Sequence, residues 1–180
     1  MFIVFEGIDG AGKSTLTELT AQWLEDVCPT KKILTTHEPY RSSSPEPGID
    51  PLLWYCIDRQ YHIRDYIAPA LKRGDIVLCD RYYHSTAAYQ SEGGDLWMSH
   101  AIAQRFAQKC IPDMFFWVRT PPEIAIERRP NEAYRRLCDL DVNYLLIMNF
   151  RKPYPVHCIC GEIPLERQLQ EVQSKIRVVL

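Results

Sequence analysis

Residues 7–14 read GIDGAGKS, and an apolar run, residues 1–5, precedes them with one glutamate between. The spacing G-x-x-x-x-G-K-[ST] lets backbone amides turn toward phosphate oxygens, while Lys13 reaches the terminal phosphates and Ser14 can join the shell of a magnesium ion. Apolar residues recur at helical spacing directly after the loop. A strand, this loop and a helix predict an α/β domain that binds a nucleotide; the alternative is a glycine turn that only joins strand to helix.

The composition narrows the class of protein. The 21 basic and 23 acidic residues among 180 give a formal charge of -2, which argues against a nonspecific nucleic-acid binder. No apolar stretch approaches the ~20 residues of a membrane span, and the N-terminus lacks the basic region of a signal peptide. We therefore expect a cytoplasmic protein with neither a nucleic-acid nor a membrane partner. The seven cysteines form an odd, scattered set, which favours reduced thiols.

The order of the apolar segments predicts a parallel sheet. Strands are expected at residues 1–5, 32–36, 75–80, 114–118 and 155–159. Helices are expected directly after the loop, over 52–73, around 96–110, and from residues 121 and 164. Strands that alternate with helices indicate a three-layer α/β domain, with a central five-stranded parallel sheet flanked by helices. The third strand ends in Asp80, which places this carboxylate at the C-terminal edge of the sheet, where ligands bind.

Four segments of the first half match the pattern of one family. Residues 80–90 read DRYYHSTAAYQ and meet every fixed position of D-R-[YFH]-x-x-S-x-x-A-Y-Q, while residues 5–15 read FEGIDGAGKST. Residues 37–39 read HEP, similar to R-E-P, and residues 58–59 read DR within the long helix. In this order and separation, the four segments resemble thymidylate kinases. The resemblance is specific over residues 2–90 and weak beyond Cys110.

The resemblance implies a P-loop kinase fold in a single domain, residues 1–180, with a short lid around residues 127–140. It implies transfer of the γ-phosphoryl group of ATP, with Mg2+, to the 5'-phosphate of dTMP, a step of dTTP biosynthesis. The acceptor phosphate is already an anion, so the reaction needs alignment and charge stabilisation rather than a covalent intermediate. The family also pairs through long helices, which implies a homodimer.

The resemblance assigns the loop to ATP and its neighbours to catalysis. The residues that would bind ATP are Gly7, Ile8, Asp9, Gly10, Ala11, Gly12, Lys13, Ser14 and Thr15. Ser14 and Asp80 would hold the magnesium ion or its waters. The candidate catalytic residues are Lys13, Arg81, Asp9 and Arg128. Arg81 would present a planar cation to the phosphates, and Arg128 belongs to a basic lid that would exclude water.

The resemblance also implies a binding site for dTMP. Its residues would be Asp9, Glu38, Tyr40, Tyr55, Arg59, Arg81, Ser85, Thr86, Tyr89 and Gln90. In the family, an arginine at the position of Arg59 donates to the O4 oxygen of thymine, and the amino group of cytosine cannot accept that hydrogen bond. Tyr55 would stack on the base, and Asp9 would accept a hydrogen bond from the 3'-hydroxyl. Tyr89 would lie against C2' and exclude a 2'-hydroxyl.

Two segments depart from the family pattern. His37 replaces the usual arginine, and residues 40–42 read YRS in place of G-G-T. Glu38 and Tyr40 are expected to meet the acceptor phosphate there, with Arg41 as a candidate for the missing cation. Gly10 stands where some members carry a basic residue in the loop, which implies that the catalytic arginine lies on the lid.

Other interpretations stay open from the sequence alone. Purely structural roles are a surface ion pair for Arg81, a helix cap for Asp80, core packing for Tyr55 and a solvated charge run around Arg128. Functional alternatives are a related kinase with a different deoxynucleoside or deoxynucleotide acceptor, and a nucleotide-binding protein with weak turnover.

Overall fold

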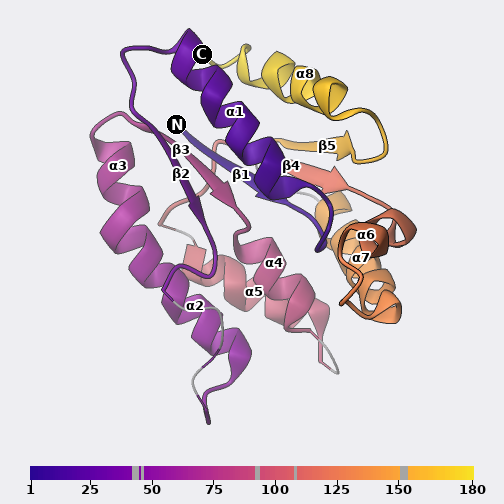
Figure 1. The fold of residues 1–180 in the computed structure, drawn as a ribbon. Coiled ribbons are helices and arrows are strands. Elements are labelled where there is room, and N and C mark those ends of the chain that lie inside the picture. Colours follow the sequence, from indigo (N-terminus) through magenta and orange to yellow (C-terminus); the bar gives the residue numbers. More distant parts are fainter. Residues whose placement is uncertain (42–44, 46, 92–93, 108, 151–153) are drawn as a thin grey trace.

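The computed structural model describes residues 1–41, 45, 47–91, 94–107, 109–150 and 154–180. Within these residues, five parallel strands form a sheet in the order β2-β3-β1-β4-β5 (Figure 1). The strands are β1 (Phe2–Glu6), β2 (Ile33–His37), β3 (Ile76–Asp80), β4 (Met114–Arg119) and β5 (Val156–Cys160). The predicted α/β fold with a central five-stranded parallel sheet is confirmed.

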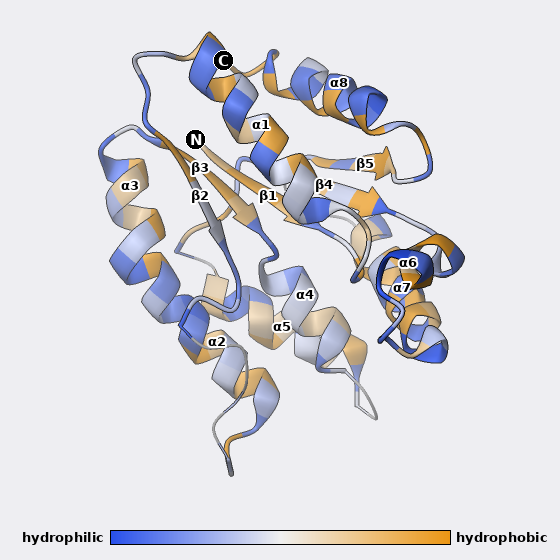
Figure 2. Cartoon of the chain, in the orientation of Figure 1, coloured by the Kyte–Doolittle hydropathy of each residue, from blue (hydrophilic) through white to orange (hydrophobic). Residues whose placement is uncertain are grey.

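Helices cover both faces of this sheet, with α1 and α8 on one face and α2 to α5 on the other (Figure 1). The helices are α1 (Lys13–Val27), α2 (Pro51–His62), α3 (Ala68–Lys72), α4 (Tyr83–Tyr89), α5 (Leu96–Ala107), α6 (Pro122–Arg128), α7 (Tyr134–Asn149) and α8 (Leu165–Ile176), with a π-helical segment η1 (Ile63–Ile67) between α2 and α3. Figure 2 shows apolar strands at the centre and mixed, largely polar helix surfaces outside. The layers follow from this difference, because each helix buries only its apolar stripe.

Strand β1 is buried on both sides and divides the core. Ile3 and Phe5 belong to the cluster that includes residues of α1, α7 and α8, whereas Phe2 and Val4 belong to the cluster with residues of α2, η1 and α5. Successive side chains of a strand point to opposite faces, so one apolar run serves both layers. The loop that follows β1 is thereby fixed at the C-terminal edge of the sheet.

The helix expected over residues 52–73 is one continuous helical run that widens into η1 before Pro69. The amide of Ala68 bonds to the carbonyl oxygen of Ile63, five residues back. A proline ring inside a regular α-helix clashes with a carbonyl of the preceding turn, and the wider π-turn relieves this. Gly74, with φ of 86°, follows the run as predicted.

Helices α4 and α7 were not predicted from the sequence. All residues of α4 from Tyr83 to Ala88 are buried, so its pattern has no polar face that would mark a helix. Helix α7 begins inside the segment expected to be a lid, residues 127–140, and packs against α4 and α6. The lid function stays a prediction, as does the single-domain boundary.

None of the described helices combines the length and apolar character that crossing a membrane requires. The cytoplasmic location stays a prediction.

Candidate active site

The loop between β1 and α1 packs directly against α6. Gly10 has φ of 79° and Gly12 has φ of 98°, a left-handed conformation that glycine adopts without strain. A Cβ atom on Gly10 would lie 2.5 Å from the carbonyl oxygen of Ala125. The absence of a side chain at Gly10 therefore lets α6 approach the loop, and it brings Arg128, the last residue of α6, beside it.

Lys13 is buried beneath this loop. Its Nζ donates a hydrogen bond to the carbonyl oxygen of Ile8 over 2.8 Å. Burial lowers the pKa of Lys13 to about 8, with a further contribution from the positive charge of Arg81, while Asp80 and Asp9 act in the opposite direction. An anion placed beside the amine would raise this pKa again, so a bound phosphate would stabilise the charged form of Lys13.

Asp80 lies beside the loop because β3 pairs with β1, with Asp80 opposite Phe5. The hydroxyl of Ser14 donates to Oδ2 of Asp80 over 2.5 Å. Oδ1 of Asp80 is buried and has no hydrogen-bond partner in the part of the chain that the structure describes. Hydroxyl and carboxylate oxygens are ligands that Mg2+ prefers, so this pair fits the shell of a magnesium ion.

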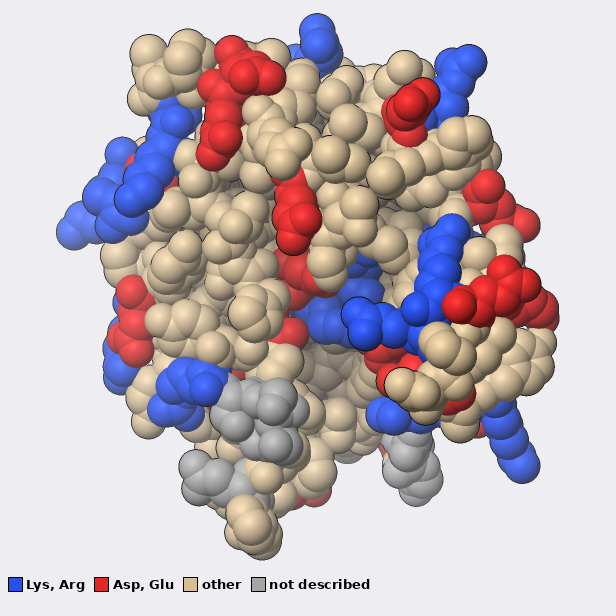
Figure 3. Space-filling view, viewed as in Figure 1, with Lys and Arg blue, Asp and Glu red and all other residues tan. Residues whose placement is uncertain are grey.

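A cavity of about 460 Å³ lies over the loop, and we call it the loop cavity. Its lining residues are Asp9, Gly10, Gly12, Lys13, Ser14, Thr15, His37, Glu38, Asp80, Arg81, Arg128 and Arg129. Figure 3 shows basic side chains gathered in a hollow on this face, with acidic ones beside them. Arg128 is held there by hydrogen bonds to the carbonyl oxygens of Gly10, over 3.2 Å, and Gly161, over 3.4 Å. The loop cavity thus combines the glycine-rich loop with Lys13, Arg81, Arg128 and Arg129, a set of cations that polyphosphate binding requires.

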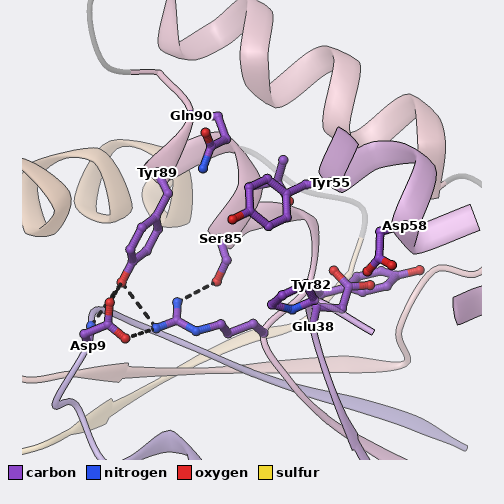
Figure 4. A pocket seen from close by; sticks show the side chains of 11 residues that line it. Asp9, Glu38, Tyr55, Asp58, Tyr82, Ser85, Tyr89 and Gln90 are labelled. Atoms are coloured by element: carbon purple, nitrogen blue, oxygen red, sulfur yellow. Dashed lines mark hydrogen bonds and ion pairs between the residues drawn. The ribbon is translucent and has the colours of Figure 1, made fainter. Parts of the chain in front are cut away.

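A second cavity of about 290 Å³ lies between α2 and α4, and we call it the helix cavity. Its lining residues are Asp9, Glu38, Pro39, Tyr55, Asp58, Arg81, Tyr82, Ser85, Thr86, Tyr89 and Gln90. Figure 4 shows the Tyr55 ring and Gln90 on one side and Asp9 on the other. The two cavities share Asp9, Glu38 and Arg81, so they adjoin at these three residues.

Asp9, Arg81 and Tyr89 are linked where the cavities adjoin (Figure 4). The carboxylate of Asp9 pairs with Nη2 of Arg81 and accepts a hydrogen bond from the Tyr89 hydroxyl over 2.8 Å. The same hydroxyl accepts one from the Asp9 amide over 3.1 Å. Burial alone would raise the pKa of Asp9, but Arg81, Tyr89 and Lys13 together hold it below its ordinary value. An ionised carboxylate and a guanidinium therefore face the junction.

Arg59 and Glu38 form a buried ion pair behind the helix cavity. Nε of Arg59 lies 2.9 Å from Oε2 of Glu38, and Nη2 also donates to the Thr86 hydroxyl over 2.6 Å. The two side chains are 1% and 7% exposed. Nη1 of Arg59 is buried without a hydrogen-bond partner among the described residues. A buried guanidinium nitrogen without a partner fits a site where a ligand carbonyl completes the hydrogen bonding.

Helix α2 carries Tyr55, Asp58, Arg59 and His62 at helical spacing, and of these Tyr55 and Asp58 line the cavity while Arg59 and His62 are buried behind it. Nδ1 of His62 lies 3.2 Å from Oε1 of Glu38, and its Nε2 lies 2.8 Å from the Thr36 hydroxyl. This contact joins α2 to the end of β2.

The segment after β2 is held by the carboxylate of Asp58. The amides of Tyr40 and Arg41 donate to it over 2.5 Å and 3.1 Å. The Tyr40 ring stacks on His62 with centroids 4.6 Å apart, and the Arg41 guanidinium lies 3.6 Å from the centroid of Tyr61. Neither Tyr40 nor Arg41 is among the described residues that line the two cavities. Their expected contact with an acceptor phosphate stays a prediction.

The structure brings most of the predicted site residues to these two cavities. Those at the loop cavity are Asp9, Gly10, Gly12, Lys13, Ser14, Thr15, Asp80, Arg81 and Arg128. Those at the helix cavity include Glu38, Tyr55, Ser85, Thr86, Tyr89 and Gln90, with Arg59 bonded to two of them from behind. Gly7, Ile8 and Ala11 belong to the loop backbone and are not lining residues of the described cavities.

Arg129, one of the basic residues of the expected lid, joins Arg128 at the loop cavity. Three further residues at the site, His62, Glu6 and Tyr144, were missed in the sequence. His62 bonds to Glu38. Glu6 is fully buried at the end of β1, and Tyr144 of α7 donates to its carboxylate over 3.1 Å. A carboxylate that ends an otherwise apolar strand is a usable signal for Glu6, whereas nothing local marks Tyr144.

The comparisons with known proteins agree with this geometry. The family profile described as "Thymidylate kinase" matches residues 48–139. The thymidylate kinase of Synechococcus sp. (strain RCC307) is 35% identical over 156 residues, covering 76% of this chain and 74% of that protein. The thymidylate kinase of Prochlorococcus marinus (strain NATL2A) is 38% identical with the same coverages. That of Mesomycoplasma hyopneumoniae (strain J / ATCC 25934 / NCTC 10110) is 35% identical and covers 71% of this chain and 69% of that protein.

Proposed function

The chain belongs to the thymidylate kinase family, and we propose that its two adjoining cavities hold the two substrates of that reaction. The enzyme transfers the γ-phosphoryl group of ATP to the 5'-phosphate of dTMP, giving ADP and dTDP. An oxygen of the dTMP phosphate attacks the γ-phosphorus, and the bond from that phosphorus to the bridging oxygen of ADP breaks. The observation that carries the site assignment is the sharing of Asp9, Glu38 and Arg81 by both cavities.

In this proposal the loop cavity binds the phosphates of ATP. Backbone amides of the loop and Lys13 would surround the terminal phosphates, and these anions would offset the burial that lowers the pKa of Lys13. Ser14 and Asp80 would hold a magnesium ion, which supplies positive charge to phosphate oxygens when bound. The buried, unpartnered Oδ1 of Asp80 supports this assignment.

The helix cavity binds dTMP in this proposal. The Tyr55 ring offers a stacking surface for thymine. Arg59 lies directly behind the cavity residues Glu38 and Thr86, and we infer that its unpartnered Nη1 donates to the thymine O4 oxygen when dTMP is bound. Ser85, Thr86 and Gln90 offer polar groups to the rest of the base. The sugar then lies toward Asp9 and Tyr89, whose paired side chains leave little room for a 2'-hydroxyl.

Catalysis rests on the charges at the junction of the cavities. Arg81 would contact the phosphoryl group during its transfer, because Arg81 lines both cavities and is held by Asp9. Arg128 would add a second cation from the loop side. Residues 127–140 would act as a lid that excludes water when ATP binds.

We also propose that the enzyme is a homodimer through α2 and α5. These helices pack side by side and expose large apolar side chains, Leu53 and Ile57 on α2 and Met98 on α5. An apolar patch of this kind is typical of a protein interface. Sedimentation should show a dimer, and a purely monomeric species at all concentrations would contradict this proposal.

A panel of acceptors tests the proposed function. ADP release from ATP is measured with dTMP, dUMP, dCMP, dGMP, AMP and thymidine. The highest kcat/KM is expected for dTMP; a protein that shows no preference for dTMP, or that uses thymidine instead, refutes the assignment. Lys13→Ala should lose nearly all turnover, and full activity in that variant would refute the ATP site.

A further inference from the structure

Glu6 is a fully buried carboxylate directly before the phosphate-binding loop. Its Oε1 accepts hydrogen bonds from the amides of Tyr82, over 2.9 Å, and Ser85, over 3.2 Å. Its Oε2 accepts hydrogen bonds from the hydroxyls of Ser85, over 2.6 Å, and Tyr144, over 3.1 Å. The buried imidazole of His84 also lies beside it, with Nδ1 3.7 Å from Oε1. Four hydrogen-bond donors therefore hold this buried carboxylate, and it caps the N-terminal end of α4.

These bonds surround a strained residue. Arg81 has φ of 72°, which makes it a non-glycine residue in the left-handed region among those the structure describes. Such a conformation is strained for a residue that has a Cβ atom, and it persists only where the surroundings impose it. Here the Arg81 amide donates to the carbonyl oxygen of Phe5 over 2.9 Å, and the next amide, that of Tyr82, donates to Glu6. The peptide groups on both sides of Arg81 are therefore held by β1.

The same carboxylate reaches the Arg81 side chain through one hydroxyl. Oγ of Ser85 donates to Glu6 and accepts a hydrogen bond from Nη1 of Arg81 over 3.2 Å (Figure 4 shows the latter bond). Glu6 thus determines where the Ser85 oxygen lies, and that oxygen fixes one edge of the guanidinium. The other edge is paired with Asp9.

Tyr144 connects α7 to this network. Its ring is fully buried, and its hydroxyl lies 2.7 Å from Ser85 Oγ as well as 3.1 Å from Glu6. Helix α7 begins at Tyr134, just after the arginines at the end of α6. The position of α7 is therefore tied to the same two groups that orient Arg81.

We propose that Glu6 is a positioning residue for phosphoryl transfer: it holds the backbone and, through Ser85, the guanidinium of Arg81 in the reactive arrangement, and Tyr144 anchors α7 to the same carboxylate. Glu6 does not line either described cavity, so it acts through Arg81. This proposal rests on the role of Arg81 in the proposed function.

A double-mutant cycle between Glu6 and Arg81 tests the proposal. The kcat for ATP and dTMP is measured for the wild type, Glu6→Gln, Arg81→Ala and the double variant, with thermal stability recorded for each. Glu6→Gln should lower kcat about tenfold or more while the KM for ATP changes little, because charge-assisted bonds to Arg81's neighbours are lost. In the Arg81→Ala background the same change should lower kcat less than about twofold.

Equal losses from Glu6→Gln in both backgrounds would show a general structural effect and overturn the proposal. A low kcat for Arg81→Ala without coupling to Glu6 refutes the positioning role of Glu6 and leaves the catalytic role of Arg81 intact. Wild-type turnover in Arg81→Ala refutes both roles. If Glu6→Gln fails to fold, Tyr144→Phe replaces it in the cycle and removes one hydroxyl. Tyr144→Phe should lower kcat by about two- to tenfold.

Tyr154→Phe is the matched control for that variant. Its hydroxyl is also buried in the core, bonds to Tyr83 and His84, and makes no direct bond to Glu6 or Ser85 among the described contacts. Its link to the Glu6 carboxylate is indirect, because Nδ1 of His84 lies 3.7 Å from Oε1 of Glu6. Tyr154→Phe should keep the wild-type kcat. Equal kcat values for Tyr144→Phe and Tyr154→Phe would overturn the role assigned to Tyr144.

Discussion

Replacing Arg59 by methionine removes two roles of one side chain. Arg59 neutralises Glu38 in a buried ion pair, and in the proposed function its Nη1 donates to thymine. Methionine is unbranched, shorter than arginine and uncharged, so Arg59→Met leaves the Glu38 carboxylate buried, with His62 as its remaining ion-pair partner among the described residues. The variant should therefore lose both stability and affinity for dTMP.

The loss of stability can be estimated from the burial of the pair. Removing one partner of a buried ion pair costs roughly 3–5 kcal/mol, because the remaining charge stays desolvated. In a domain of this size each kcal/mol lowers Tm by about 2–4 °C. Arg59→Met should thus unfold about 6–20 °C below the wild type in a thermal scan.

A second substitution distinguishes the two roles. Arg59→Met combined with Glu38→Gln removes the orphaned charge, so Tm should recover by more than about half of the loss. The KM for dTMP should stay raised about tenfold or more, since the donor to the base is still absent. Glu38→Gln alone is the matched control.

Two results would refute this reasoning. A loss below about 1 kcal/mol in Arg59→Met would show that the pair behaves as an exposed one. A double variant with the wild-type KM for dTMP would show that Arg59 does not contact the base.

Other substitutions test the loop cavity. Burial and the positive charge of Arg81 lower the pKa of Lys13 to about 8, so its charge is lost as pH rises through that value. ATP affinity measured by calorimetry should therefore fall between pH of about 7 and about 9.5. Lys13→Arg stays charged and should lack this fall, and a flat wild-type profile would contradict the assignment. Asp80→Asn should raise the Mg2+ concentration for half-maximal activity about 10- to 100-fold, and an unchanged Mg2+ dependence would remove Asp80 from the metal site. Gly10→Ala should destabilise the protein by roughly 1–3 kcal/mol in urea unfolding, because its Cβ would meet the Ala125 carbonyl. Gly48→Ala, with φ of 84° and open space around it, is the control and should cost clearly less; equal losses would show that contact with α6 is not the cause.

The sequence predicted the elements whose signals are local. An apolar β-branched run ending in a carboxylate was enough to predict β3 and the place of Asp80, and Gly74 marked the end of the helical run. The loop motif predicted a tight turn between β1 and α1, because its glycines can adopt the left-handed conformation found at Gly10 and Gly12. The residue types of the helix cavity followed from the resemblance, and the structure places Tyr55 on α2 and Ser85, Thr86 and Tyr89 on α4.

The rest depends on contacts between distant residues. Tyr144 reaches Glu6 across 138 positions of sequence, and neither residue shows its partner in its local pattern. The direction of Tyr40 is fixed by stacking on His62 and by the Asp58 carboxylate, which no turn signal encodes. Helix α4 is buried around most of its surface, so the periodicity that reveals surface helices is missing.

The central claim is that the loop cavity and the helix cavity form one two-substrate site. A single molecule in which adenosine and thymidine are joined through a chain of phosphates tests it directly. The inhibition pattern of this compound is measured against ATP and against dTMP. Competition with both substrates, and binding tighter than either alone, is the predicted result; competition with only one substrate would contradict the claim.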